Sequence, residues 1–429
     1  MGKNTELLIG QTLVFAPKLP ARAEHDSRGG VLIRDGVIEA VGHGETLKAA
    51  HPDVPVTDVG DGVILPGFID AHVHYPQTAI IASWGKRLID WLNTYTFPEE
   101  MKFADPAYAA QIACRFFDLS LAHGTTTVAS YGTVHAASVD AFFEEASARG
   151  LRAVAGKTCM DRNAPDGLMD TPQSAYDDSR ALLERWHGHD RLSYAITPRF
   201  SPTSTRDQLS ALGTLWTENP TCPMQTHLAE QTDEVVWVAE LFPEARDYLD
   251  TYEAAGLLGV GGLYGHAIHL TDREWSRMGE VGGALVHCPT SNAFIGSGLF
   301  DMDRGLSAPM PVGLATDTGG GSSFSMLRTM ASAYEVAQLR GRALSAAELL
   351  WLATIGSAQA LRLDDKIGRL APEYEADLIV LNLASTPAIA QRAAQANDIW
   401  EAIFPTIMMG DDRAIAEVRI MGQRIAPQG

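Results

Sequence analysis

The sequence predicts an α/β protein: a (β/α)8 barrel of the TIM type with a small β-sandwich domain formed from both termini. Between residues 66 and 368, eight short apolar segments alternate with segments of helical periodicity. Both flanks of this region are instead rich in short strands and tight turns. Five of the eight apolar segments also carry histidine or aspartate near their ends, which is typical of a barrel whose chemistry lies at the carboxyl ends of its strands.

The sandwich domain is predicted from residues 1–65 together with residues 369–429. The first part has three short strands, at Thr12–Phe15, Gly30–Arg34 and Val37–Val41. Asp35-Gly36 separates the last two and is a strong hairpin signal. The second part has strands at Ala376–Leu381 and Ala414–Ile420, followed by a turn at Met421-Gly422. Two β-rich ends that flank one α/β body are expected to pair into a single domain.

The barrel is predicted from residues 66–368. Its eight strands are Phe68–His74, Thr125–Ser130, Ala153–Thr158, Ser193–Arg199, Pro223–His227, Leu263–His269, Ala284–His287 and Val312–Asp317. Helical periodicity is found, for example, at Ala109–Ala122, Val139–Arg149, Ser174–Trp186, Thr205–Trp216 and Asp233–Leu241. A doubly wound open sheet is the alternative fold, but no glycine-rich phosphate loop follows the first strand.

The composition excludes several kinds of partner. The chain of 429 residues has 53 acidic against 33 basic residues and a formal charge of −20, so it repels nucleic-acid polymers and anionic membranes. We find no cationic leader and no apolar run long enough to span a bilayer. The four cysteines are scattered without a CxxC pair, which favours neither a thiolate zinc site nor a disulfide framework. We therefore expect a cytoplasmic protein.

His72 and His74 are the most informative pair of residues. They lie at the end of the first predicted barrel strand, and side chains two positions apart on a strand point to the same side. Two imidazoles directed at one point are a suitable start for a transition-metal site. Taken alone, the pair is equally compatible with two packed or solvent-facing histidines.

The other strand ends favour the metal site. His227 ends the fifth strand, His266 and His269 lie on the sixth, and Asp317 ends the eighth. In a closed barrel these ends converge, and three histidines with one aspartate suit Zn²⁺ with a position left for water. His269, His287, His123 and His135 have a higher chance of being structural, although a supporting role for His287 beside the metal stays open.

Glu230 and His266 are the candidates for proton transfer. Glu230 follows His227 by three residues, just beyond the strand end. A glutamate is usually a solvated surface acid, but beside a metal-bound water a carboxylate can carry protons between water and substrate. His266 faces the same end of the barrel, where an imidazole can orient the attacking water.

With these residues set out, the chain resembles the amidohydrolase superfamily and, within it, the metal-dependent guanine deaminases. The resemblance extends from about Thr12 to Ile425 without a large gap. Its motifs are Pro66–Gln77, Trp91–Pro98, Met160–Pro165, Thr197–Ser204, His227–Glu230, Gly265–Asp272, His287–Asn292 and Thr316–Met326. The first motif alone indicates only the superfamily, whereas Tyr75-Pro76-Gln77 combined with Arg199-Phe200 is much narrower.

The resemblance implies a set of site residues. The metal ligands would be His72, His74, His227 and Asp317. The catalytic residues would be Glu230, His266 and Asp317. The substrate pocket would be formed by His74, Tyr75, Pro76, Gln77, Arg199, Phe200 and His227. It also implies one Zn²⁺ per subunit, although this donor set accepts Fe²⁺ as well, and it implies a homodimer, for which the sequence marks no interface.

One departure from part of the superfamily concerns the number of metals. Some members hold two metals bridged by a carboxylated lysine at the end of strand four. Here the fourth predicted strand ends in Arg199-Phe200, and Lys157 lies on the third. The chain is therefore expected to bind a single metal.

The implied activity is the hydrolysis of guanine to xanthine and ammonia by a zinc-activated water. Asp317 would take a proton from that water, Glu230 would protonate an adjacent ring nitrogen, and His266 would hold the oxygen. Arg199 offers a fork of N–H donors to the O6 and N7 of guanine, Gln77 matches a second edge, and Phe200 stacks on the ring. For Arg199, the alternative is a surface salt bridge.

Other functions stay open at this point. A related amidohydrolase deaminase acting on another purine, an oxidised guanine, a pterin or a chlorinated triazine would share the zinc and Glu230 and would differ only in the pocket. A catalytically silent scaffold predicts a missing ligand, yet every ligand is present. The cytidine-deaminase-type fold is excluded because its His-x-Glu and Pro-Cys-x-x-Cys signature is absent.

Overall fold

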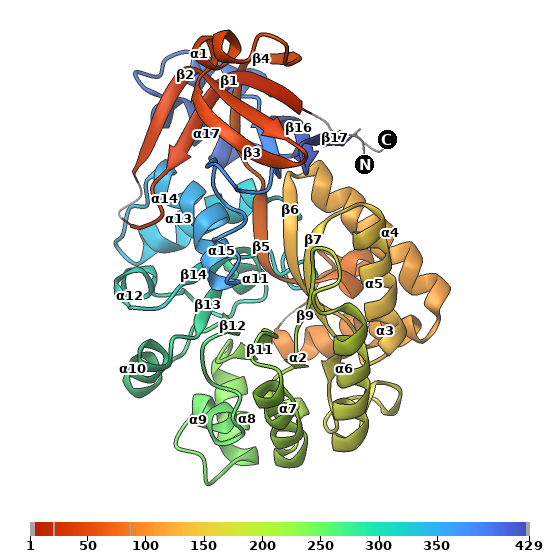
Figure 1. The fold of residues 1–429 in the computed structure, drawn as a ribbon. Helices are drawn as coiled ribbons and strands as arrows, with labels where there is room; N and C mark the ends of the chain where they lie inside the picture. Colours follow the sequence, from red (N-terminus) through yellow and green to blue (C-terminus); the bar gives the residue numbers. More distant parts are fainter. Residues whose placement is uncertain (1–4, 20–21, 86, 426–429) are drawn as a thin grey trace.

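The computed structural model describes residues 5–19, 22–85 and 87–425. A barrel of parallel strands is flanked by helices, and a mixed sheet lies at one end of it (Figure 1). The sheet combines the first strands of the chain, in red, with the last ones, in blue. Within the described residues, no helix has the length and apolar character needed to cross a bilayer.

The strands of both ends form one sheet of seven strands, in the order β17-β16-β15-β4-β1-β2-β3. Their bounds are Thr5–Phe15 (β1), Ala23–Arg34 (β2), Val37–His43 (β3), Val56–Pro66 (β4), Leu378–Leu381 (β15), Ile415–Ile420 (β16) and Gln423–Ile425 (β17). The antiparallel pairing of β4 with β15 joins the two ends of the chain. The predicted pairing of the two ends is therefore observed. Among the described strands, however, it produces one continuous sheet where a sandwich would have two.

The barrel consists of two parallel four-stranded sheets, β5-β6-β7-β9 and β11-β12-β13-β14, with a short pair of β8 and β10. The bounds are Phe68–His74 (β5), Thr125–Tyr131 (β6), Arg152–Gly156 (β7), Thr158–Cys159 (β8), Leu192–Tyr194 (β9), Thr197–Pro198 (β10), Met224–Leu228 (β11), Gly262–His266 (β12), Ala284–His287 (β13) and Val312–Leu314 (β14). All eight predicted strands are present, in the predicted order.

Backbone hydrogen bonds close the barrel on both sides. The amide of Asp317 donates to the carbonyl of His72 (3.0 Å), and the amide of His74 donates to Thr318 (3.2 Å). On the opposite side, the amide of Gln225 donates to Ile196 (2.9 Å). Because the first seam includes both histidines and the aspartate of the predicted metal site, closure of the barrel itself brings these residues together.

Two predicted strands are broken in the structure. Ala153–Thr158 divides into β7 and β8, and Ser193–Arg199 divides into β9 and β10. At the break, Gly156 packs so closely on the carbonyl oxygen of Ala195 that a Cβ there would lie 1.8 Å from it. The hydroxyl of Thr197 also donates to that oxygen (2.9 Å), which takes the place of a ladder hydrogen bond. A side chain therefore replaces a main-chain partner, and the strand is interrupted.

Four of the five predicted helices begin one to three residues earlier than periodicity predicts, and Arg206–Glu218 begins one residue later. Capping side chains precede two of the earlier starts: Asp105 accepts a hydrogen bond from the amide of Ala107, and Thr171 accepts one from the amide of Ser174. The helices around the barrel are Pro106–Ala122 (α4), Ala136–Ala148 (α5), Pro172–Trp186 (α6), Arg206–Glu218 (α7), Thr232–Leu241 (α8), Tyr248–Ala254 (α9), Asp272–Val281 (α10), Pro289–Phe294 (α11), Met302–Ser307 (α12), Met326–Leu339 (α13), Ala346–Trp351 (α14) and Ser357–Ala360 (α15). The others are Gly44–Ala50 (α1), Leu88–Trp91 (α2), Phe97–Glu100 (α3), Pro387–Ala393 (α16) and Ile399–Met409 (α17).

An ion-pair network joins the terminal sheet to the barrel. Arg152, at the start of β7, donates to Glu375 (2.8 Å), and Arg191, before β9, donates to Glu375 (2.6 Å) and pairs with Asp377. Asp377 also accepts from the amide of Met421 (2.9 Å). Since Arg152 and Arg191 lie at the amino ends of their strands, the sheet covers the amino-terminal face of the barrel and leaves the opposite face for the site.

Replacement of Arg191 by alanine is expected to lower the free energy of unfolding by about 3 kcal/mol, because it leaves the buried carboxylate of Asp377 without its charged partner. The measurement is urea denaturation followed by fluorescence. Arg180→Ala, which removes an exposed ion pair with Glu184, is the matched control and should leave stability nearly unchanged. Equal effects of the two substitutions would contradict a stabilising role for the network.

Candidate metal centre

The four predicted ligands converge at the carboxyl ends of the barrel strands. His72 and His74 lie on β5, His227 lies on β11, and Asp317 follows β14. One oxygen of Asp317 is 3.5 Å from Nε2 of His72 and 3.5 Å from Nε2 of His74. Nε2 of His74 is 3.0 Å from Nε2 of His227. All four side chains are buried, so donors from distant parts of the chain surround one point that is shielded from solvent.

The donors themselves indicate a cation. Nδ1 of His227 lies 2.7 Å from the carbonyl oxygen of Arg199, and because a carbonyl only accepts, Nδ1 must carry the proton. Neutral His227 then directs the lone pair of Nε2 at Nε2 of His74. Nε2 of His72 is buried and has no hydrogen-bond partner among the described residues. Imidazole lone pairs brought so close are stabilised by a divalent metal ion, which this set of nitrogens and one carboxylate oxygen suits.

The electrostatics favour the metal-binding forms of these residues. Burial lowers the pKa of His72, and it lowers the pKa values of His74 and His227 well below their usual range, so these imidazoles are neutral, which is the form that binds a metal. Burial acts in the opposite direction on Asp317, but its contact with His72 and the nearby His266 outweigh it and lower the pKa to about 2. The aspartate is therefore ionised.

Left-handed backbone conformations direct the functional side chains. Ala229, His266 and Asp317 have φ angles of 47°, 67° and 50°, which residues other than glycine adopt rarely. Such conformations cost on the order of 1–3 kcal/mol each and cluster at functional sites. β12 ends at His266 itself, and β14 ends at Leu314, three residues before Asp317, so both end earlier than the predicted ends at His269 and Asp317. The left-handed residues thus lie at or just beyond strand ends.

Glu230 lies beside the four predicted metal ligands, and its side chain is contacted from two sides. The hydroxyl of Ser297 donates to one carboxylate oxygen of Glu230 (2.9 Å), and the other oxygen is 3.6 Å from Nε2 of His266. Its backbone amide and that of Gln231 donate to the buried Glu234 (2.9 and 3.0 Å). Burial raises the pKa of Glu230 to about 7, since it outweighs the opposing charge of His266. A carboxyl group with this pKa can both accept and release a proton near neutral pH.

His266 is oriented by Asn292. Nδ1 of His266 lies 2.9 Å from the amide oxygen of Asn292, so Nδ1 donates and Nε2 faces the site. Nε2 lies 3.8 Å from the second carboxylate oxygen of Asp317. Burial lowers the pKa of His266, but the charges of Glu230 and Asp317 outweigh it and raise the pKa overall. Asn292 has no predicted role, although it lies in the recognised motif His287–Asn292.

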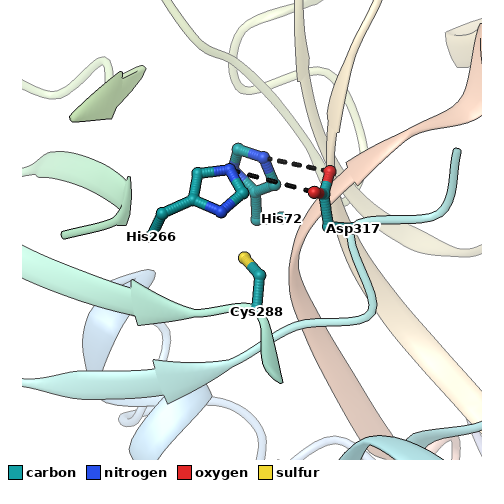
Figure 2. Close-up of side chains that lie close together, drawn as sticks. All are labelled: His72, His266, Cys288 and Asp317. Atoms are coloured by element: carbon teal, nitrogen blue, oxygen red, sulfur yellow. Dashed lines mark ion pairs between the residues drawn. The ribbon is translucent and has the colours of Figure 1, made fainter. Parts of the chain in front are cut away.

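Cys288 lies close to two of the predicted ligands. Its sulfur and the donor atoms of His72, His266 and Asp317 all lie within 4.8 Å of one another (Figure 2). Burial raises the pKa of this thiol well above its usual value, and the charge of Asp317 adds to the effect. Its sulfur donates weakly to the carbonyl of Val286 (3.6 Å). Both effects favour the protonated thiol of Cys288.

A pocket opens next to the predicted ligands. The predicted residues Gln77, Arg199, Phe200, Glu230 and His266 line it, together with three of the predicted metal ligands: His74, His227 and Asp317. The walls that were not predicted are Leu88, Trp91, Leu92, Ile295 and Gly320. Of these, Trp91, Leu92 and Gly320 lie in recognised motifs, whereas Leu88 and Ile295 carry no signal in the sequence. Apolar walls with a few fixed polar groups suit a small planar heterocycle.

Tyr75 and Pro76 lie outside this lining. The ring of Tyr75 is fully buried and packs against Phe103 and Phe142, with centroids 5.5 and 5.2 Å away. Its hydroxyl donates to the carbonyl of Ser138 (2.5 Å). A 3-10 turn at Tyr75–Ile80 follows β5 and rotates these side chains into the core, while Gln77 turns back to the pocket. The structure therefore gives Tyr75 a supporting position and no contact with the pocket.

Arg199 forms a buried ion pair, not the surface salt bridge considered above. Its Nη1 donates to both carboxylate oxygens of Glu100, at 3.1 and 2.8 Å. The guanidinium also lies over the ring of Phe97 (5.7 Å to the centroid). Glu100 is not among the predicted site residues, because the adjacent pair Glu99 and Glu100 is typical of the solvated first turn of a helix.

The remaining candidates lie apart from the metal ligands. His269 contacts the carbonyl of Ser297 (2.9 Å), and His287 is stacked on Phe300 (4.6 Å between centroids). Burial, helped by the charge of His266, lowers the pKa of His287 to about 3. Lys157 is buried in an ion pair with Asp170 (2.7 Å). The amine of Lys157 is thus paired with a carboxylate, and the predicted number of metals stays a prediction.

The chain is similar to known proteins over nearly its whole length. The amidohydrolase family matches residues 63–425, and an imidazolonepropionase-like composite domain of bacteria matches residues 29–53. A guanine deaminase of Escherichia coli (strain K12) is 43% identical over 398 residues, covering 92% of this chain and 91% of the relative. A solved structure of E. coli guanine deaminase has a TM-score of 0.95 at 40% identity and covers 98% of this chain and 99% of that one. A guanine deaminase from C. acetobutylicum with guanine bound in its active site has a TM-score of 0.91 at 28% identity and covers 99% and 100%.

Proposed function

The chain belongs to the amidohydrolase family, as a relative of guanine deaminases, and we propose that it hydrolyses guanine to xanthine and ammonia with one Zn²⁺ per subunit. The main observation in support is that the predicted metal ligands are buried directly beside the pocket. His72, His74, His227 and Asp317 lie close together beside a pocket that is also lined by Glu230, Gln77 and Arg199. Metal ligands, a proton carrier and polar groups for a heterocycle thus share one cavity.

In this proposal, each residue acts at a defined atom. Bound zinc supplies a Lewis acid that lowers the pKa of water to about 7. Asp317 accepts a proton from the attacking water, and Glu230 donates a proton to the ring nitrogen next to C2. His266, with Nε2 facing the site, donates to the oxygen that adds to C2. The amine leaves as ammonia after proton transfer, so that water and guanine yield xanthine and ammonia.

Recognition of the purine is proposed for Arg199, Gln77 and Phe200, which line the pocket. The N–H groups of Arg199 suit the O6 and N7 acceptors of guanine, whereas adenine presents an amino group in place of O6. The side-chain amide of Gln77 forms a hydrogen bond with a second polar edge of the purine, and the ring of Phe200 stacks on the purine plane.

The decisive experiment measures the release of ammonia, and of chloride from the triazine, by the zinc-loaded protein from a panel that includes guanine, 8-oxoguanine, adenine, a pterin and a chlorinated triazine. We expect guanine to have the highest kcat/KM, with xanthine as the product. A higher kcat/KM for another compound would identify a related deaminase instead. Metal analysis of the same sample tests the proposed stoichiometry and distinguishes Zn²⁺ from Fe²⁺, and light scattering tests the proposed homodimer.

Arg199→Ala is expected to raise KM for guanine by roughly 10- to 100-fold with a smaller change in kcat, since a bidentate contact contributes about 1–3 kcal/mol of discrimination. The substitution also leaves Glu100 without its charged partner, so thermal stability should be measured in parallel. Arg162→Ala, which removes an arginine that donates to the carbonyl of Ser201 (2.9 Å) and does not line the pocket, is the control. An unaltered guanine KM in a folded Arg199→Ala protein would refute the role.

A further inference from the structure

Glu100 is a fully buried carboxylate that contacts two of the polar residues of the pocket. It ends α3 and has no solvent-exposed surface. One of its oxygens accepts from Nε2 of Gln77 (3.1 Å) and from Nη1 of Arg199 (3.1 Å), and the other accepts from Nη1 of Arg199 (2.8 Å). A buried carboxylate is costly unless it is paired, and here its partners are the two groups proposed to read the substrate.

The carboxylate of Glu100 determines which end of the Gln77 side-chain amide is available to bind a ligand. An ionised carboxylate only accepts hydrogen bonds, so it binds the NH₂ end of the amide and leaves Oε1 for another partner. Gly319 restricts the amide further. A Cβ at Gly319 would lie 2.1 Å from Oε1 of Gln77, and the φ of 117° suits glycine alone. Close packing by the glycine backbone thus supports one orientation, in which Gln77 offers an acceptor.

The same carboxylate orients Arg199. With Nη1 bound to Glu100 and the guanidinium plane over Phe97, the other N–H donors of Arg199 have a fixed direction in a pocket that this residue lines. Its main-chain carbonyl meanwhile accepts from Nδ1 of His227 (2.7 Å), which connects the recognition residue to a proposed metal ligand. The backbone and the side chain of Arg199 are therefore both held.

We propose that Glu100 is a positioning residue that sets the hydrogen-bonding pattern of the pocket. In this pattern Gln77 presents an acceptor oxygen to the ligand, and Arg199 presents N–H donors next to it. This pattern is complementary to a lactam edge, in which a ring N–H lies next to a carbonyl oxygen. It would select heterocycles in the 6-oxo form and reject those with an unprotonated ring nitrogen and an amino group. The inference rests on the proposed function, because it concerns the same pocket, and it names the chemical feature that is read.

The test measures binding, so that it does not depend on turnover. Hypoxanthine has the lactam edge but no amine to be hydrolysed, and unsubstituted purine lacks both. Isothermal titration of the zinc-loaded protein should show tighter binding of hypoxanthine than of purine. Glu100→Gln has the same shape but allows the Gln77 amide to turn either way, so we expect it to reduce this preference by roughly 10- to 100-fold.

Glu99→Gln is the matched control. Glu99 is also buried and adjacent in sequence, but it pairs with Lys102 (2.6 Å) and with Tyr108, and it does not line the pocket. The Glu99→Gln variant should prefer hypoxanthine over purine to the same extent as the unaltered protein. Zinc content and melting temperature, measured for every variant, separate lost recognition from lost structure.

Glu100→Asp is a second variant in case Glu100→Gln does not fold. It keeps the charge beside Arg199 but shortens the side chain by one methylene, so the preference should fall without loss of zinc. An unchanged preference in whichever variant folds, or no preference for hypoxanthine in the unaltered protein, would overturn the inference. Failure of the proposed function would be seen separately, as the absence of ammonia release from guanine.

Discussion

His227→Ala is expected to lose bound metal and activity together. Nε2 of His227 lies 3.0 Å from Nε2 of His74, and its Nδ1 is held by the carbonyl of Arg199, so the imidazole is oriented before any metal binds. Alanine removes one of four donors and leaves a gap in a buried site. Because a metal Lewis acid supplies several kcal/mol, kcat should fall by at least about 10³-fold.

The measurement combines metal analysis of the purified variant with the guanine-to-xanthine absorbance assay. His189→Ala is the control, since the side chain of His189 is exposed and contacts Asp190 and the ring of Trp186, neither of which lines the pocket. It should retain metal and activity. Full metal occupancy in His227→Ala, or normal turnover, would show that His227 is not a ligand. Retention of metal with reduced turnover would instead place it among the residues that contact substrate.

Glu230→Gln is expected to keep its metal and lose turnover by roughly 10²- to 10⁴-fold, the usual contribution of a positioned proton carrier. Glutamine has nearly the same shape and can still accept from Ser297, so the local structure should persist. It cannot take up and release a proton near neutral pH, as a carboxyl group with a pKa of about 7 can. Zinc content, KM and kcat measured on one preparation separate these effects.

Two further variants make this test sharper. Glu240→Gln changes an exposed acid on α8, the helix that follows Glu230, and should leave kcat unchanged. Ser297→Ala removes only the hydroxyl that donates to Glu230, so its loss should be smaller than that of Glu230→Gln. A fully active Glu230→Gln protein would remove this residue from the mechanism, and an equal loss in Glu240→Gln would indicate a general effect on the helix.

Local spacing along the chain predicted much of the fold. Alternation of strand and helix predicted the α/β barrel, and the period-two spacing of His72 and His74 placed both imidazoles on one side of β5. The structure differs where the backbone leaves the extended region. The left-handed φ of His266 ends β12 three residues before the predicted end, because an extended backbone would direct the imidazole away from the site.

Local spacing was also enough for most of the candidate site. His227 and Glu230 lie at and just beyond a strand end, and Asp317 follows the last strand of the barrel, so their common location follows from the (β/α)8 topology alone. Tyr75 and Pro76 show the limit of this reasoning. They adjoin Gln77 in sequence, but the turn after β5 directs the ring of Tyr75 into the core between Phe103 and Phe142.

The partners of the recognition residues depended on contacts between distant segments. Glu100 and Arg199 are 99 positions apart, and Glu230 and Ser297 are 67 apart, so no periodicity relates them. Whether an acidic residue is solvated or buried against an arginine depends on which segments pack over it, and adjacent Glu99 and Glu100 have different partners. Periodicity along the chain reports the direction of each side chain relative to its own strand or helix. The pairing of charges in the interior, and with it the hydrogen-bonding pattern of the pocket, is set by the packing of whole elements against one another.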